Sequence, residues 1–370
     1  MRNYKIDLLR GVSILLVLIH HFNIPYKLQD TFLGIQIGGE SLSTLIARNG
    51  NYGVTMFFVI SGFLITQHSI QRSGSLAQIR LKDFYIRRIA RILPCLVLLV
   101  AIVTVLGALG VPPFINQSPN GVEVSYAVTV LSAFSFWMNL LIIEYGWVNY
   151  ALGVLWSLSV EEVFYFAFPV LCLVLGRGKG FIAFLLIIIV YAPYFRALHF
   201  GDASGAYLYH YFSSFDGIAL GCLTAIYAQH FKAAIYTPKA IVVVTAFLMM
   251  ALYFYAPIKE VSTWAISVFA LLTALLLLCF QQNQNHKPIS FVAKGLIWMG
   301  QRSYEMYLFH LIVLGLIKAV YFPKETLAAE KLMLLPLYFI TIFILSWAIE
   351  KYYSVPLNVK IRRYCLGSSS

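Results

Sequence analysis

Long apolar runs separated by short polar loops dominate the chain. A helix needs roughly 17–25 mainly apolar residues to cross a bilayer, and these runs have about that length. The candidate runs lie near residues 10–26, 50–69, 92–110, 126–143, 155–175, 181–198, 210–230, 240–257, 262–280, 297–320 and 332–350. The pattern predicts an all-α polytopic membrane protein.

The charges in the loops indicate how the helices are oriented. Lys and Arg cluster in the loops 72–91, 177–179 and 285–294, before the first run and after the last one. The other loops hold only scattered basic residues, among them Arg196. Because cytoplasmic loops carry the excess of Lys and Arg, the basic loops and both termini are predicted to be cytoplasmic.

One of the eleven runs should not cross, because an odd number of crossings would leave the termini on opposite sides. The run 126–143 is rich in Ser and aromatic residues, contains Asn139 and has no basic residue on either flank. We expect it to be re-entrant or interfacial, which leaves about ten transmembrane helices. Residues 1–366 are then a single membrane domain, and residues 367–370 are a tail or cloning scar.

The amino-acid composition agrees with a polytopic membrane protein and gives no indication of a nucleic-acid partner. The 370 residues are 60% hydrophobic and 11% charged, with a mean hydropathy of +0.80, as in polytopic membrane proteins. The net charge of +12 does not indicate nucleic acid, because the basic residues do not gather on one soluble face. The five cysteines include no CxxC pair, so neither a disulfide framework nor a metal site is indicated.

Ionisable residues inside apolar runs are candidates for function, because the bilayer rejects them unless they are paired or hydrated. The alternative for a single membrane histidine is a hydrogen bond to a neighbouring helix. Glu305, near one end of its run, is expected to be interfacial. The full set is His20, His21, Glu161, Glu162, Asp216, Glu305 and His310.

The first run, LRGVSILLVLIHHF, places two of its polar residues on one helical face. His21 follows Arg10 by eleven residues, or about three turns and 16 Å. Arg10 is predicted at the cytoplasmic edge and His21 toward the outer leaflet. His20 points about 100° away, so a structural role is favoured for it.

Two later runs bring polar groups to a similar depth. In LWSLSVEEVFYF, the residues Ser157, Glu161 and Tyr165 form a stripe at i, i+4 and i+8. In GQRSYEMYLFHLIVL, the outgoing helix places His310 in the middle or outer half of the membrane. We therefore expect His21, Glu161 and His310 to lie at comparable depth.

Two cytoplasmic features are suited to a phosphorylated ligand. Arg88 and Arg91 share a helical face just before Pro94, and their guanidinium groups match phosphate oxygens, either of lipid or of a cofactor. In FFVISGFLI, Ser61 and Gly62 interrupt the apolar sequence. Gly62 allows either close helix packing or room for a thin ligand.

A long donor with phosphates at one end and a reactive group at the other would span this layout, and acyl-coenzyme A has that shape. His21 would then act as the general base on an acceptor hydroxyl that attacks the thioester. Glu161 would orient the imidazole, and Ser157, Tyr165 or His310 would stabilise the oxyanion.

Six short motifs in order resemble the membrane acyltransferase-3 family of bacterial O-acyltransferases, over nearly the whole chain. They are IDLLRGVSILLVLIHHF with Arg10 and His21, FFVISGFLI, the RIAR of Arg88 to Arg91, WSLSVEEVFYF, FDGIALG with Asp216, and SYEMYLFH with Tyr304 and His310. The roles of Asp216, Tyr304 and His20 are structural or uncertain.

The resemblance implies transfer of an acyl group, usually acetyl from cytoplasmic acetyl-CoA, to a glycan or glycolipid at the outer face of the bacterial inner membrane. It implies no permanently bound cofactor and no metal. Some members carry a fused extracytoplasmic SGNH-type domain, which we expect to be absent here. Either the membrane part acts alone among the lipids or a separate extracytoplasmic transferase finishes the reaction.

A different class of function remains open on the same residues. A proton-coupled exporter could use His21, Glu161 and His310 as a relay, with Arg10, Arg88 and Arg91 binding an anionic substrate. Exporters of this kind often show matching halves with broken helices, and no such halves are visible in the sequence. A purely structural membrane protein would leave the polar residues unexplained.

Overall fold

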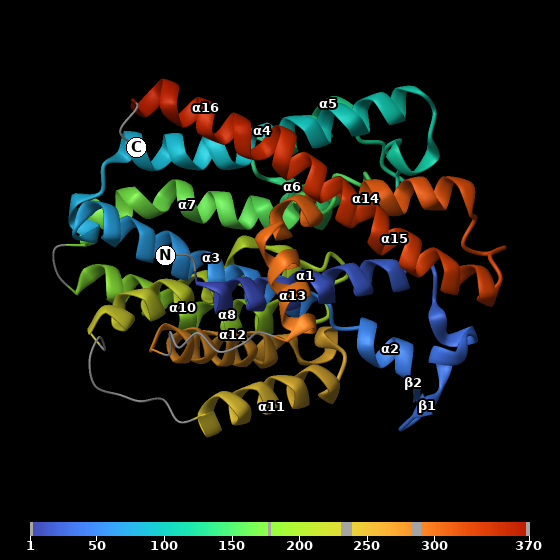
Figure 1. Cartoon of the computed structure of the whole chain (residues 1–370), viewed down its shortest axis with the longest axis horizontal. Helices are drawn as coiled ribbons and strands as arrows, with labels where there is room; N and C mark the ends of the chain where they lie inside the picture. Colours follow the sequence, from blue (N-terminus) through green and yellow to red (C-terminus); the bar gives the residue numbers. More distant parts are fainter. Residues whose placement is uncertain (1–2, 177–178, 231–238, 283–289, 368–370) are drawn as a thin grey trace. The chain divides into compact units, whose positions relative to one another are not determined.

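The computed structural model describes residues 3–176, 179–230, 239–282 and 290–367, and the described chain is almost entirely helical (Figure 1). Its contacts group into two compact units. Unit one comprises residues 1–16, 51–81 and 160–301, and unit two comprises 17–50, 82–159 and 302–370. The predicted basic loops 177–179 and 285–294 and the tail 367–370 lie partly outside the described residues.

The prediction of an all-α polytopic membrane protein is confirmed. Among the described residues, eight helical stretches are long and apolar enough to cross a membrane. They are Tyr4–Asn23, Leu42–Ser73, Leu81–Ala108, Leu155–Leu175, Gly180–Leu198, Ile258–Phe280, Ser303–Val320 and Ala328–Leu366.

This number is lower than the ten expected, and two helices account for the difference. Helix α11 (Lys239–Tyr255) is apolar but has only 17 residues. Helix α10 (Tyr211–His230) has 20 residues, but Asp216 and several Ser and Gly residues dilute its apolar character.

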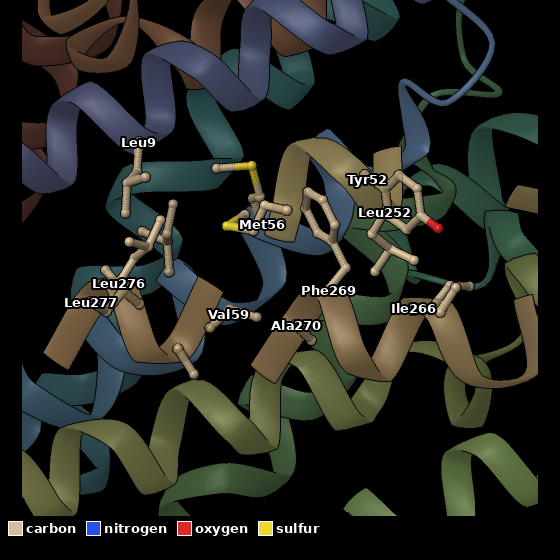
Figure 2. Packing of buried hydrophobic residues seen from close by; sticks show 14 of the residues in the cluster. Leu9, Tyr52, Met56, Val59, Leu252, Ile266, Phe269, Ala270, Leu276 and Leu277 are labelled. Carbon is tan, nitrogen blue, oxygen red and sulfur yellow. The ribbon is translucent and has the colours of Figure 1, made fainter. Parts of the chain in front are cut away.

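Unit one is a helical bundle around an apolar core. It contains the first part of α1 (Tyr4–Asn23), α3 (Asn51–Ser73), most of α7 (Leu155–Leu175), α8 (Gly180–Leu198), α9 (Ala206–Tyr209), α10, α11, α12 (Ile258–Gln282) and α13 (Phe291–Gln301). The Tyr52 ring of α3 stacks on the Phe269 ring of α12 with 4.3 Å between centroids. Met56, Val59 and Ala270 continue this core along the two helices (Figure 2).

Helices α3 and α10 approach so closely that only glycine fits at the contact. A Cβ added to Gly62 would lie 2.1 Å from the Ile218 carbonyl oxygen, and one added to Gly221 would lie 2.0 Å from that of Val59. Each helix thus presents a glycine to the backbone of the other. This contact supports the packing interpretation of Gly62.

Arg196, predicted among the scattered basic residues of the exterior side, lies in the last turn of α8 and is buried within the protein. Its side of the membrane stays a prediction. Its side chain is fully buried, and its guanidinium donates to the Asp216 carboxylate at 2.9 Å and to the Ser213 carbonyl at 2.5 Å. Ser267 of α12 donates to the same carboxylate at 2.5 Å. An arginine at the end of an apolar run can turn inward when a buried carboxylate compensates its charge, and here the pair connects α8, α10 and α12.

Unit two carries the remaining elements. They are the end of α1, the hairpin of β1 (Gln36–Ile37) and β2 (Glu40–Ser41), α2 (Leu42–Ala47), α4 (Leu81–Ala108), α5 (Tyr126–Phe134), α6 (Met138–Tyr145), the start of α7, α14 (Ser303–Val320), α15 (Ala328–Ile349) and α16 (Val355–Leu366). The hairpin strands are antiparallel, with Gln36 opposite Ser41. A π-helical turn, Glu350–Ser354, joins α15 to α16, so the last helical stretch extends beyond the predicted end near 350.

The run 126–143 forms two short helices rather than one long helix. Helix α5 has nine residues and α6 has eight, so each is about half as long as a membrane crossing requires. Between them Phe136 adopts a φ of 59°, a left-handed conformation that interrupts the helical path. The short helices agree with the expectation that this run does not cross.

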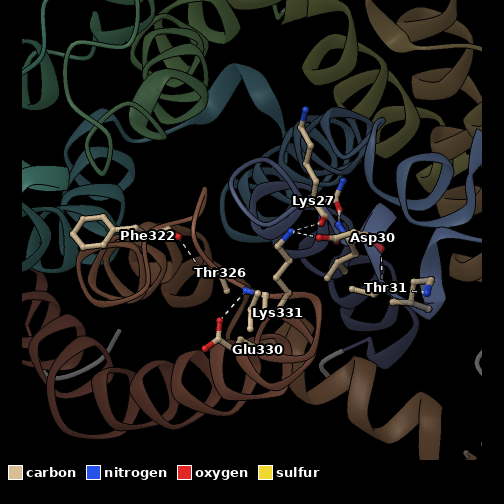
Figure 3. A network of polar contacts seen from close by, with 11 residues as sticks. Lys27, Asp30, Thr31, Phe322, Thr326, Glu330 and Lys331 are labelled. Atoms are coloured by element: carbon tan, nitrogen blue, oxygen red, sulfur yellow. Dashed lines mark hydrogen bonds and ion pairs between the residues drawn. The ribbon is translucent and has the colours of Figure 1, made fainter.

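A polar network ties the loop after α1 to the start of α15 (Figure 3). The Lys331 ammonium donates to the Asp30 carboxylate at 2.6 Å and to the Lys27 carbonyl at 3.3 Å. The hydrogen bond from Lys331 lowers the pKa of the Asp30 carboxyl below its usual value. The Glu330 carboxylate accepts from the Leu327 backbone and so caps the start of α15.

The close contact between α3 and α10 predicts that even one added methyl group at its glycines destabilises the protein. Gly62→Ala or Gly221→Ala should lower the stability of the protein by about 1–3 kcal/mol, because the added carbon must push the two helices apart. Thermal unfolding in detergent, followed by tryptophan fluorescence, measures this loss. Gly295→Ala is the matched control, because a Cβ at helical Gly295 meets no described atom within 4 Å. Equal melting temperatures for all three variants would contradict the close contact.

The buried ion pair predicts a double-mutant cycle with strong coupling. Arg196→Met should destabilise the protein by about 3–5 kcal/mol, because it leaves the Asp216 charge buried without its partner. Adding Asp216→Leu to that variant should restore most of the stability, since no uncompensated charge then remains. Chemical unfolding in detergent gives the four stabilities. Additive losses in the double variant would show that the two side chains act independently.

Candidate functional site

The clearest polar cluster in unit two begins at His21, in the last turn of α1. Its Nδ1 lies 2.9 Å from the carbonyl oxygen of Val17, one turn earlier in the same helix. A carbonyl can only accept a hydrogen bond, so in the neutral ring Nδ1 carries the proton. Nε2 is then left with a free lone pair, which is the state that a general base requires.

His310, on α14, makes the same kind of backbone contact. Its Nδ1 lies 2.7 Å from the Tyr307 carbonyl oxygen, so its neutral ring also keeps the lone pair on Nε2. The residue is fully buried, and its Nε2 has no hydrogen-bond partner within the described residues. The His310 and His21 rings lie 4.7 Å apart, edge to face at 65°. Two rings this close cannot readily both be charged.

His20 has a different environment from its neighbour in sequence. Its ring stands at 83° to the His21 ring, and its Nδ1 lies 2.7 Å from the Ala47 carbonyl at the end of α2. This bond ties α1 to α2, which supports the structural interpretation of His20.

Two hydroxyl groups lie beside the histidine pair. Ser157 Oγ, on the first part of α7, is 2.6 Å from the Tyr307 hydroxyl, which donates to the Val154 carbonyl at 3.2 Å. The Tyr307 and His310 rings are 5.8 Å apart. The structure therefore brings Ser157 and His310 together through Tyr307, a residue that the sequence analysis missed. Its position three residues before His310, on the same helical face, was the available signal.

Unit two also holds the predicted phosphate-binding residues, near the other end of α14. Arg88 and Arg91 lie on α4, where the Tyr304 hydroxyl donates to the Ile92 carbonyl at 2.9 Å. Arg91 interacts electrostatically with Glu305, which accepts a hydrogen bond of 2.7 Å from Ser354 of the π-helical turn.

Glu305, expected near the membrane interface, is buried within the protein, with only 6% of it exposed. Its depth in the membrane stays a prediction. The helical pattern could not show that the π-helical turn would cover this carboxylate. Arg302, which forms an ion pair of 2.8 Å with Glu350, encloses the same end of α14.

The other predicted site residues belong to unit one. Arg10 lies 3.9 Å from the Asp7 carboxylate on α1, and Ser61 and Gly62 lie on α3. Glu161 and the buried Tyr165 continue the polar stripe of α7 beyond Ser157. Asp216 has a structural partner in Arg196. The roles predicted for Arg10, Ser61, Gly62, Glu161 and Tyr165 stay predictions.

The described part of the chain contains no cluster of three or more His, Cys, Asp or Glu residues with a geometry suited to a metal ion. It does contain two neighbouring imidazoles that keep a lone pair on Nε2, and beside them the Ser157 hydroxyl, whose proton can turn from Tyr307 toward a ligand. Such a group can remove a proton from a hydroxyl and stabilise a developing negative charge without a covalent intermediate on the protein.

Comparison with known proteins gives consistent relatives. An O-acetyltransferase of Staphylococcus aureus (strain COL), so named provisionally, is 28% identical over 341 residues, which is 85% of this chain and 51% of that protein. The O-acetyltransferase OatA of Staphylococcus aureus (strain NCTC 8325 / PS 47) is 26% identical, over 85% of this chain and 51% of its own length. The peptidoglycan O-acetyltransferase OatA of Listeria monocytogenes serovar 1/2a is 24% identical, over 84% of this chain and 49% of its own.

The chain thus spans about half the length of these curated relatives. No solved structure matches it significantly. The family model described as an acyltransferase domain matches residues 3–351, nearly the whole chain. With its polytopic helices and its relatives among O-acetyltransferases, this chain belongs to the acyltransferase domain family.

Proposed function

We propose that this protein is a membrane O-acyltransferase that moves an acetyl group from cytoplasmic acetyl-CoA to a hydroxyl of a glycan on the outer side of the membrane. The observation that carries the proposal is the His21–His310 pair. Both rings use Nδ1 on a helix carbonyl, and both keep the Nε2 lone pair for chemistry.

In the proposed reaction, His21 Nε2 removes the proton from the acceptor hydroxyl while that oxygen attacks the thioester carbonyl carbon. An ester C–O bond forms, the thioester C–S bond breaks, and the proton passes to the departing sulfur, which leaves as coenzyme A thiol. The Val17 carbonyl holds the imidazolium through Nδ1–H during the step. This contact keeps the ring in one orientation while its charge changes.

The Ser157 hydroxyl is the proposed donor to the oxyanion. A hydroxyl has a single proton to donate, and Tyr307 donates its own to the Val154 carbonyl, so Ser157 donates to the Tyr307 oxygen before the substrate arrives. In the proposed reaction the Ser157 O–H turns from Tyr307 to the developing oxyanion and stabilises its charge. The proposed role of His310 is to share the proton with His21.

On the cytoplasmic side, Arg88 and Arg91 are proposed to hold the phosphates of the donor. Arginine keeps its charge and forks onto phosphate oxygens, which suits the coenzyme A end of the molecule. The donor is a substrate that leaves after each turnover, not a resident cofactor.

The acceptor is proposed to be a peptidoglycan-type glycan, since the relative from Listeria monocytogenes is named a peptidoglycan O-acetyltransferase. The cell membrane of a bacterium, the inner membrane where there are two, is then the location, and acetyl is the simplest acyl group. A separate extracytoplasmic transferase is a proposed partner if the membrane part does not complete the reaction. The exporter alternative has no similar support, because the matching family and the relatives are acyltransferases.

The role of His21 can be tested with purified protein in proteoliposomes. His21→Ala should lower acetyl transfer to soluble peptidoglycan oligosaccharides by about 10²–10⁴-fold, because it removes the general base. Transfer is measured as coenzyme A release together with mass spectrometry of the oligosaccharides. His199→Ala, at a partly exposed histidine of unit one, is the control and should keep the wild-type rate. Unchanged acetylation by the His21 variant would remove the catalytic assignment.

The proposed role of Arg88 and Arg91 predicts an effect on acetyl-CoA binding. Arg88→Ala and Arg91→Ala should each weaken acetyl-CoA binding in nanodiscs by roughly tenfold, because each removes a charge-assisted hydrogen bond to phosphate. Isothermal titration calorimetry measures the affinity directly. Lys82→Ala is the matched control, since Lys82 is an exposed basic residue of the same helix. If both arginine variants bind like the wild type, the pair serves topology or lipid contact instead.

A further inference from the structure

Lys318 is a positive charge that the proposed reaction does not use. It lies in the last turn of α14, eight residues and about 12 Å along the helix from His310. Its ammonium sits 3.8 Å from the centroid of the Tyr150 ring. No carboxylate of the described chain lies within ion-pair distance of it, and its side chain is half-buried. A half-buried ammonium without an anion is costly unless something supplies one.

Three tyrosines of unit two interact with one another here, and Tyr150 is the one in contact with Lys318. The Tyr26 hydroxyl donates to the Tyr321 carbonyl at 2.6 Å, just beyond the end of α14. Burial raises the pKa of the Tyr150 phenol, and the neighbouring Tyr26 phenol raises it further. Tyr338 of α15 is the third, and its phenol interacts electrostatically with that of Tyr150.

Tyr338 supplies a second, independent sign of a missing ligand. Its hydroxyl is completely buried and has no hydrogen-bond partner in the part of the chain that the structure describes. Buried hydroxyl groups nearly always find a partner, so an unpaired one calls for an explanation. The Tyr338 ring lies 5.5 Å from that of Phe22, so this part of α15 packs against the last turn of α1.

We propose that Lys318, held over Tyr150, binds a carboxylate of the acceptor glycan together with the unpaired hydroxyl of Tyr338. This rests on the proposed function and specifies its substrate class, namely an anionic rather than a neutral glycan. Lys318 supplies the charge, the Tyr338 hydroxyl donates a hydrogen bond, and the aromatic rings pack against the sugar. Lys318 is thus a specificity residue that places the acceptor hydroxyl near His21 and takes no part in proton transfer.

The simpler explanation of Lys318 is that it complements the dipole at the end of α14. The two explanations differ in what they predict for the acceptor. A lysine that serves the dipole affects stability and is indifferent to the charge of the glycan. A lysine that binds the carboxylate discriminates between a charged glycan and its neutral ester.

The test compares two forms of one probe. The first is a tetrasaccharide of alternating N-acetylglucosamine and N-acetylmuramic acid with free lactyl carboxylates, and the second is its methyl ester. Binding to the full chain in nanodiscs is measured by calorimetry. The wild type should bind the carboxylate form about tenfold tighter than the ester, the gain of one charge-assisted hydrogen bond.

Three variants complete the test. Lys318→Met should bind both forms equally, with its affinity for the ester unchanged, and Lys318→Arg should keep most of the preference because it keeps the charge. Lys324→Met, at a nearby exposed lysine, is the matched control and should behave like the wild type. The proposal is overturned if the wild type binds the two forms equally or not at all, or if Lys318→Met retains the preference.

His21→Ala distinguishes this proposal from the reaction itself. It should transfer no acetyl group and still prefer the carboxylate form. If the wild type releases no coenzyme A with either form, yet loses its preference on Lys318→Met, the carboxylate site stands and the proposed reaction fails. If transfer occurs and Lys318→Met has equal KM changes for both forms, the reaction stands and the carboxylate site is excluded.

Discussion

Polar side chains within apolar helices need a hydrogen-bond partner, and the backbone of the same helix is the nearest one. Ser13, Thr104 and Thr273 all donate to the carbonyl four residues earlier. His21 follows the same rule with Val17, but an imidazole has a second nitrogen. The same hydrogen bond occupies the only proton of a serine hydroxyl but only one nitrogen of an imidazole. In His21 it therefore sets the tautomer and leaves a lone pair on Nε2 that can act as a base. The possible chemistry of the site depends on this contact.

Buried charged side chains need a partner even more than neutral polar side chains do. The Arg196–Asp216 pair is buried with both partners hydrogen-bonded, and it holds three helices of unit one together. Lys331 reaches Asp30 at the edge of unit two. Lys318 differs from these pairs, because its half-buried ammonium faces the Tyr150 ring and no carboxylate of the described residues. We interpret the paired charges as structural and the charge without a carboxylate as a place for a ligand.

The sequence predicted the fold class and the family well, because both depend on local properties. Apolar length reports helices directly, and the six ordered motifs each lie within one segment. Contacts between residues far apart in the sequence were harder to predict. The burial of Arg196 could not be predicted, because helical spacing does not tell whether the end of a helix faces water or a buried carboxylate. Tyr307 was missed because it is one of 24 tyrosines, and only the fold reveals its contact with Ser157.

The doubled histidine of α1 has a mechanical consequence. His20 is bound to the carbonyl of Ala47 at the end of α2, and His21 is the next residue along the chain. Adjacent residues of a helix move together, since the peptide bond between them is rigid. A displacement of α2 would therefore act on the ring of His21 through a single peptide unit. Through His20, the segment from residue 24 to 50 is thus coupled mechanically to the imidazole that we propose as the base.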